Sequence, residues 1–242
     1  MIKLFRNIRK NILEEGKTSR YLKYAIGEII LVVIGILIAL NINNWNENQK
    51  SKKDERYVLN EILKNLDEDA VLVDEIITQR QKAKTAVKAV QKVITTEMKD
   101  VDSLQYYLVD LLTFERYYPI NNAYEILKSK GLQLTNNELT TKISRYYDYE
   151  QPKMSNSILD IEVTIIKIFN DRNGLIRFLS HIDKDVRMVV KNPDDPVFIE
   201  ELTFFLVAFQ DNNGGTLDKL LVFRDINKQL RDQITNGLKD LK

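Results

Sequence analysis

The feature that most constrains this 242-residue chain is a run of twelve residues without a polar group, from Ile29 to Leu40. With its flanks the apolar stretch covers residues 24–42, which as an α-helix would measure ~28 Å, close to the ~30 Å hydrocarbon core of a bilayer. Tyr21 and Tyr24 precede this stretch and Trp45 follows it, and such rings favour the two membrane interfaces. The sequence therefore predicts a helix that crosses a membrane once.

Two alternatives fit the same stretch, a buried core helix of a soluble protein and a cleaved signal peptide. The combination of aromatic flanks, length and basic N-terminal residues favours a membrane over a protein core. No small-x-small cleavage pattern follows Leu40, because the next residues read NINNW. We therefore expect an uncleaved signal anchor with a transmembrane helix over residues 20–45.

The charges along the chain predict its orientation. Residues 1–24 carry seven cations and two anions, whereas residues 46–60 carry four cations. The positive-inside rule then places the N-terminus in the cytoplasm and the rest of the chain on the other side. From residue 46 onward, 29 cations and 32 anions alternate in sign. That distribution excludes nucleic acid as a partner, because phosphate binding needs a clustered positive face.

Residues 1–17 have the pattern of a basic amphipathic helix, in which Leu4, Ile8 and Ile12 recur every four residues among Arg and Lys. We expect this helix to lie on the anionic cytoplasmic leaflet, with docking on a cytoplasmic protein as the alternative.

Three residues of the predicted span are candidates for helix contacts. Gly35 and Ala39 form a small-xxx-small strip that would allow a homodimer through close helix approach. Glu28 either extends its carboxylate to the interface or pairs with a partner within the membrane.

The sequence around the span resembles a known family. Residues 24–47 read YAIGEIILVVIGILIALNINNWNE, and this GEI..VVIGILIAL.INNWNE motif is similar to the opening of a bacterial domain-of-unknown-function family. Residues 123–131, AYEILKSKG, resemble the middle of the same family. The resemblance implies a bacterial inner-membrane protein, anchored by one N-terminal span, whose body lies in the periplasm. It implies no activity.

The body, residues 51–242, is predicted to be one all-α domain, with a split near Asn192 as the alternative. From Ser51 to Thr95 there is no Gly or Pro, and apolar residues fall three and four apart, at Leu59, Leu63, Leu66, Ala70, Val73 and Ile77. This long helix is expected to be the first helix of a bundle, and a coiled-coil stalk is the alternative.

Caps and breakers predict the remaining helices. Asp102 or Ser103 would cap 104–112. Asn121 or Asn122 would cap 123–130, and Gly131 would end that helix. A helix over 138–170 would be interrupted near Pro152. A short helix is expected over 175–183. Another is expected over 197–210, with Asp195 as its N-cap and Pro196 in its first turn. The run DNNGG at 211–215 predicts a turn before the last helix.

The sequence carries no recognisable catalytic or cofactor motif. It has no Cys, and His181 is the only His, which excludes Cys-based zinc sites and multi-histidine metal sites. The run at 211–216 fails as a calcium loop because Thr216 stands where that loop requires Gly. We expect no enzyme activity, no cofactor and no metal.

Eight of the eleven tyrosines lie between residues 106 and 149. A tyrosine ring ends in a hydroxyl, so such a cluster suits either a binding face or ordinary core packing. The candidate binding face consists of Tyr117, Tyr118, Tyr124, Tyr146 and Tyr147.

These features together predict a membrane-anchored helical interaction or scaffolding module. Its partners would be membrane lipid and a membrane or extracytoplasmic protein. The alternative is a ligand-sensing domain that passes a signal through the span to a cytoplasmic partner.

Overall fold

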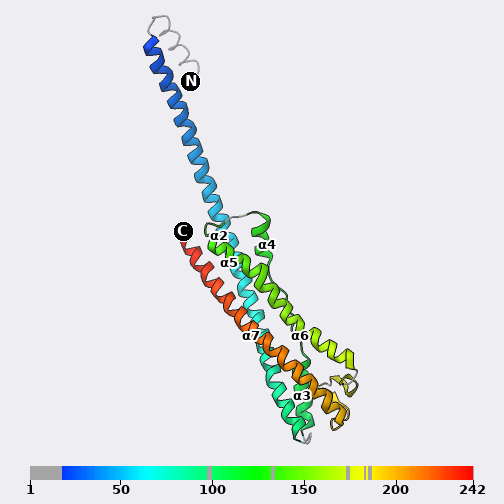
Figure 1. Cartoon of the computed structure of the whole chain (residues 1–242). Helices are drawn as coiled ribbons and strands as arrows, with labels where there is room; N and C mark the ends of the chain where they lie inside the picture. Colours follow the sequence, from blue (N-terminus) through cyan, green and yellow to red (C-terminus); the bar gives the residue numbers. More distant parts are fainter. Residues whose placement is uncertain are drawn as a thin grey trace. The chain divides into compact units, whose positions relative to one another are not determined.

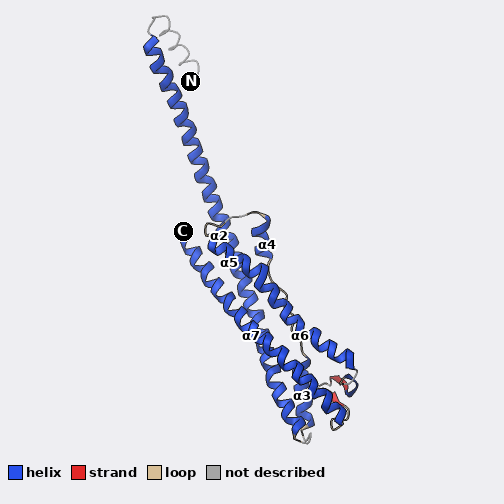
Figure 2. Ribbon diagram, in the orientation of Figure 1, coloured by secondary structure: helices blue, strands red, loops and turns tan. Residues whose placement is uncertain are grey.

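The computed structural model describes residues 18–96, 100–131, 134–172, 175–182, 184 and 187–241. The predicted basic helix over 1–17 lies outside these residues. The chain divides into two units, residues 1–54 and 55–242. The prediction of an all-α chain is confirmed, because two strands of four and three residues are the only strands in the described part (Figure 2).

The first described helix, α2, runs Thr18–Thr95 and covers both the predicted span and the predicted first helix of the body (Figure 1). No Gly or Pro occurs from Asn41 to Thr95 to end it. Near its N-terminus, α2 contains a stretch long and apolar enough to cross a membrane, and none of that stretch is buried within the protein.

The second unit is a bundle in which α7 (Pro196–Asp240) packs lengthwise against α6 (Gln151–Arg172) and the later part of α2. Side chains of α7 donate hydrogen bonds to both neighbours. The Asn212 amide reaches Thr164 Oγ1 at 3.2 Å, and the Asn227 amide reaches the Leu66 carbonyl at 3.0 Å. Shorter helices fill the remaining positions, namely α3 (Val101–Leu112), α4 (Asn122–Ser129) and α5 (Asn137–Arg145).

Two hydrophobic clusters follow one another along the bundle. One is centred on Leu66, Tyr146 and Phe223, and the other on Leu104 and Phe205. The predicted apolar stripe forms the α2 side of the first cluster, since Leu59, Leu66, Val73 and Ile77 are buried in it. Further along α2, Ala83, Val87 and Val90 are buried in the second cluster. Leu63 of the same stripe is only partly buried.

Several predicted helix ends are confirmed. Asp195 caps α7 by accepting from the Val197 N–H at 2.9 Å, with Pro196 in the first turn. Asn121 is the N-cap residue of α4, and Gly131 follows that helix with φ 57°. The cap of α3 was predicted wrongly, because Asp100 accepts from the Ser103 N–H instead of Asp102 or Ser103 acting as cap.

The predicted turn over 211–215 is wrong, because α7 continues through it to Asp240. Buried contacts within this run and directly after it hold the helix. The Asn213 amide donates to the Arg80 carbonyl at 3.2 Å, and Thr216 Oγ1 donates to the Ser157 carbonyl at 3.2 Å. Packing of the flanking Phe209 and Leu220 in the core then outweighs the low helix propensity of Asn and Gly.

The helix predicted over 175–183 is also wrong. A short 3₁₀ turn, η2 (Ile176–Phe178), leads into β1 (Leu179–Ile182), which pairs antiparallel with β2 (Met188–Val190). Phe178 and Val190 lie in the second cluster, so the hairpin covers that end of the core.

The predicted interruption near Pro152 is a π-helical segment, η1 (Tyr146–Glu150), between α5 and α6. The Gln151 N–H bonds the Tyr146 carbonyl five residues back. This wider turn accommodates Pro152, which has no N–H to donate, without breaking the helix.

Candidate functional site: an aspartate network beside a groove

Four buried polar side chains of α2 hold the segment between α3 and α5, which includes the short helix α4. In order along α2, these are Glu55, Asn65, Asp69 and Arg80. Their partners come in the opposite order, namely Thr135, the Ala123 N–H, Tyr117 and the Thr113 carbonyl. The segment from 113 to 135 therefore runs antiparallel to α2 and is fixed by polar contacts at four levels.

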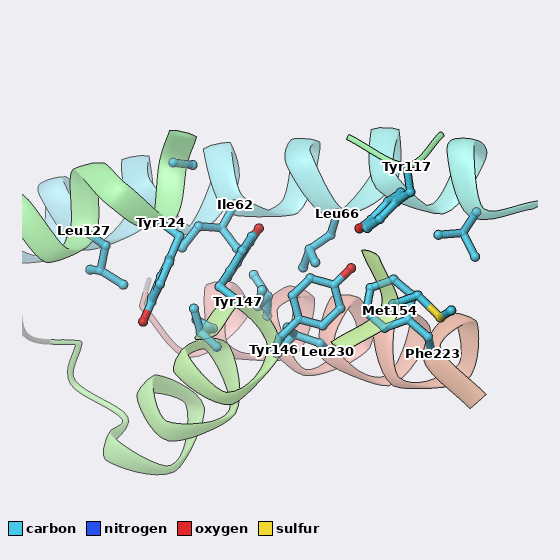
Figure 3. Close-up of a cluster of buried hydrophobic side chains, with 14 of the residues drawn as sticks. Ile62, Leu66, Tyr117, Tyr124, Leu127, Tyr146, Tyr147, Met154, Phe223 and Leu230 are labelled. Atoms are coloured by element: carbon cyan, nitrogen blue, oxygen red, sulfur yellow. The ribbon is translucent and has the colours of Figure 1, made fainter. Parts of the chain in front are cut away.

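Asp69 is the centre of the largest of these contacts. Tyr117 donates its hydroxyl to both carboxylate oxygens, at 2.6 and 2.7 Å, and Tyr146 donates to Oδ2. Gln151 Nε2 approaches the same oxygen at 3.2 Å, and the Asn227 amide donates to the Tyr146 hydroxyl at 2.9 Å. Figure 3 shows the hydroxyl ends of Tyr117 and Tyr146 turned toward one another between α2 and α7.

Burial dominates the electrostatics of this network. It raises the pKa of Asp69, and the hydrogen bonds from Tyr117, Tyr146 and Gln151 offset part of that rise. The pKa values of Tyr117 and Tyr146 are also raised, first by burial and then by the negative charge of Asp69. All three side-chain partners of Asp69 donate to it, so the network satisfies the hydrogen-bonding capacity of a buried acid.

The candidate tyrosine face is therefore mostly core. Tyr117, Tyr124, Tyr146 and Tyr147 are buried, and only Tyr118 is exposed. The Tyr124 and Tyr147 rings stack with centroids 4.8 Å apart, and Tyr146 stacks on Phe223 at 5.2 Å. Four of the five residues thus follow the alternative of core packing, because the segment η1 turns Tyr146 and Tyr147 inward.

A groove opens beside the network, where α5, η1 and α6 face α7. Two adjoining cavities of about 250 and 270 Å³ form it, and both are lined by Glu150 and Ile226. Tyr146 lines the second cavity, so the ring that bonds Asp69 also forms part of the groove wall. The apolar lining consists of Met154, Val222, Phe223, Ile226 and Leu230.

Cations predominate on the polar lining of this groove. The charged lining residues are four cations, Lys142, Arg145, Lys153 and Lys219, and two acids, Glu150 and Asp218. Arg145 pairs with Glu150 at 3.2 Å, and the Lys153 ammonium lies 5.5 Å from the centre of the Tyr149 ring. An apolar surface with a mainly cationic border suits a segment that carries apolar and acidic side chains.

The candidate residues of the span all lie on α2. Tyr24 and Trp45 are exposed, as the membrane interpretation requires, while the Tyr21 side chain lies outside the described residues. Gly35 and Ala39 are one helical turn apart, and a Cβ built on Gly35 meets nothing within 4 Å. Glu28 lies on the same helix, in its first three turns.

The described residues contain no group of three or more His, Cys, Asp or Glu side chains that could hold a metal ion. His181 lies in β1, and its side chain is outside the described residues.

Sequence reasoning missed Asp69, although a signal was present. Ile62, Leu66, Asp69, Val73 and Ile76 are spaced alternately by four and three residues, and all five are buried. An acid at a position of the apolar stripe predicts a buried polar contact.

Residues 28–162 match a family of unknown function, DUF6090. No curated protein and no solved structure matches the chain.

Proposed function

The chain belongs to the family of unknown function DUF6090, and we propose that it is a membrane-anchored helical interaction module whose body acts outside the cytoplasm. The observation that carries the proposal is the groove between α6 and α7, with its apolar lining and mainly cationic border. Its occupant would be an apolar, acidic segment of another membrane or extracytoplasmic protein.

The apolar stretch of α2 supports the anchor. It is long enough to cross a bilayer, and its large apolar side chains are exposed, which is costly in water and favourable in lipid. The excess of cations before it supports a cytoplasmic N-terminus in a bacterial inner membrane and a periplasmic body. Anchoring would restrict the groove to partners at that membrane.

The groove supports binding rather than turnover. Its charged groups are held by neighbours, as in the Arg145–Glu150 pair and the 3.3 Å contact of Lys219 with Ser157. Beneath it, the Asp69 network contains donors to one acid and no activated nucleophile. A rigid wall of this kind offers shape and charge to a partner at low entropic cost.

Photocrosslinking at two matched positions of α7 tests the proposal. Val222 lines the groove and is 60% exposed, and Val207 lies on the same helix, 62% exposed, outside both cavities. Benzoylphenylalanine would replace each in the full-length protein in its native membrane. A discrete adduct from position 222 is expected, with an acidic, apolar crosslinked peptide identified by mass spectrometry, and none from position 207.

Lys153→Glu, combined with the photoprobe at 222, should abolish this adduct by charge repulsion. No adduct from position 222, the same adduct from both positions, or an adduct that survives Lys153→Glu would contradict the proposal.

A further inference from the structure

A separate cavity lies between α2 and α7, in the part of the bundle formed by the second hydrophobic cluster. It has a volume of about 210 Å³ and is lined by Lys84, Val87, Lys88, Gln210, Asn213 and Gly214. None of these residues lines the groove described above.

The α7 side of this cavity is where the helix departs most from its local sequence preference. Gly214 and Gly215 lie inside α7, where each costs about 1 kcal/mol relative to Ala. Packing does not require either glycine, because a Cβ built at each meets nothing within 4 Å. Gly214 lines the cavity, and Gly215 does not.

Asn213 adds a second anomaly at the same place. Its side chain is 2% exposed, its amide nitrogen donates to the Arg80 carbonyl, and its Oδ1 finds no hydrogen-bond partner among the described residues. A buried acceptor without a donor costs about 1–3 kcal/mol. A hydroxyl group of a bound molecule would satisfy it.

The α2 side of the cavity is cationic. From Ile76 to Thr95, α2 carries no acid and five cations, namely Arg80, Lys82, Lys84, Lys88 and Lys92. Within the described part of the chain, neither Lys84 nor Lys88 has a carboxylate within 4.0 Å. Gln210 accepts from Gln91 Nε2 at 3.4 Å, which leaves the Gln210 amide nitrogen as a further donor.

We propose that this cavity binds a small phosphate monoester that carries a hydroxyl group. The Lys84 and Lys88 ammonium groups, one helical turn apart, would neutralise the doubly charged phosphate, with Gln210 as a third donor. The ligand hydroxyl would donate to Asn213 Oδ1, and Gly214 would let the ligand approach the backbone. In the alternative of a ligand-sensing domain, this cavity would be the ligand site, because it lies on the same helix as the apolar span.

Glycerol 3-phosphate is a probe of this chemistry, and calorimetric titration of the detergent-solubilised full-length protein measures its binding. We expect saturable binding, which Lys84→Gln and Lys88→Gln each weaken by about tenfold or more. Lys92→Gln, an exposed lysine of α2 outside the cavity lining, should leave the affinity within about twofold.

Gly214→Ala and Gly215→Ala form the second matched pair. Both should raise the melting temperature slightly through helix propensity, and only Gly214→Ala should weaken binding, because its methyl group enters the cavity. A variant that loses binding but keeps its melting temperature has therefore lost the site and not the fold.

The proposal is overturned if glycerol 3-phosphate shows no saturable binding up to about 10 mM, because a Kd above that concentration is too weak for a specific site. Equal losses from Lys84→Gln and Lys92→Gln, or from the two glycine variants, would overturn it as well.

Discussion

Tyr117 donates its hydroxyl to both carboxylate oxygens of Asp69, at 2.6 and 2.7 Å, although 48 residues separate them. This contact fixes the non-helical chain after α3 against the middle of α2. A buried acid is costly without such donors, so its partners should matter more for stability than any exposed polar group in the body.

Removal of one donor tests this relationship. Tyr117→Phe should lower the free energy of unfolding by about 1–3 kcal/mol, because Asp69 stays buried with one partner fewer. Tyr118→Phe is the matched control, since Tyr118 is the next residue and is 70% exposed, and it should change stability by less than about 0.5 kcal/mol. Urea unfolding of the detergent-solubilised protein measures both. Equal effects of the two substitutions would contradict the account.

The pH dependence of stability tests the burial of Asp69. Because burial raises its pKa above 3.8, the folded protein keeps this proton at pH values where the unfolded chain has released it. The contribution of Asp69 to stability therefore increases as pH falls through the folded pKa toward 3.8, and it is lost as pH rises.

Asp69→Asn removes this titration and serves as the reference. The unfolding free energy of the wild type, relative to that of Asp69→Asn, should increase as pH falls from about 7 to about 4. Urea unfolding at several pH values measures the difference. A difference that stays constant or decreases on acidification would show that the carboxyl group is not buried as described.

Gly131 has a backbone conformation that favours glycine, with φ 57°. Gly131→Ala should destabilise the body by about 1 kcal/mol even though a Cβ there would meet nothing within 4 Å, because the cost is in the backbone. Thermal unfolding compares this variant with Gly215→Ala. Position 215 also has room for a Cβ but has helical geometry, so that substitution should stabilise the protein slightly. Stabilisation by Gly131→Ala would contradict the assigned conformation.

The parts of the fold that follow from local pattern could be predicted. The apolar stripe of α2 and the Asp195–Pro196 start of α7 depend on residue spacing and on capping, which short stretches of sequence determine. The hairpin at β1 and β2 and the helical course of residues 211–215 depend on tertiary contacts, which local propensity does not contain.

The candidate sites were harder to predict for a related reason. Asp69 resembles a surface acid unless its position in the stripe is noticed, and Tyr146 resembles a surface residue until η1 turns it inward. The cavity at Lys84 and Gly214 joins residues 130 positions apart in the sequence, so only the packing of α7 on α2 reveals it.

The anchor is the central claim, and the composition of the chain offers a direct test. Because the sequence contains no Cys, one introduced cysteine gives a unique label site. Lys17→Cys and Ser51→Cys lie on opposite sides of the predicted span. A membrane-impermeant maleimide, applied to cells whose inner membrane is intact and accessible, should label position 51 at once and position 17 only after lysis. Labelling of position 17 before lysis, or recovery of the full-length protein without detergent in the soluble fraction, would contradict the account.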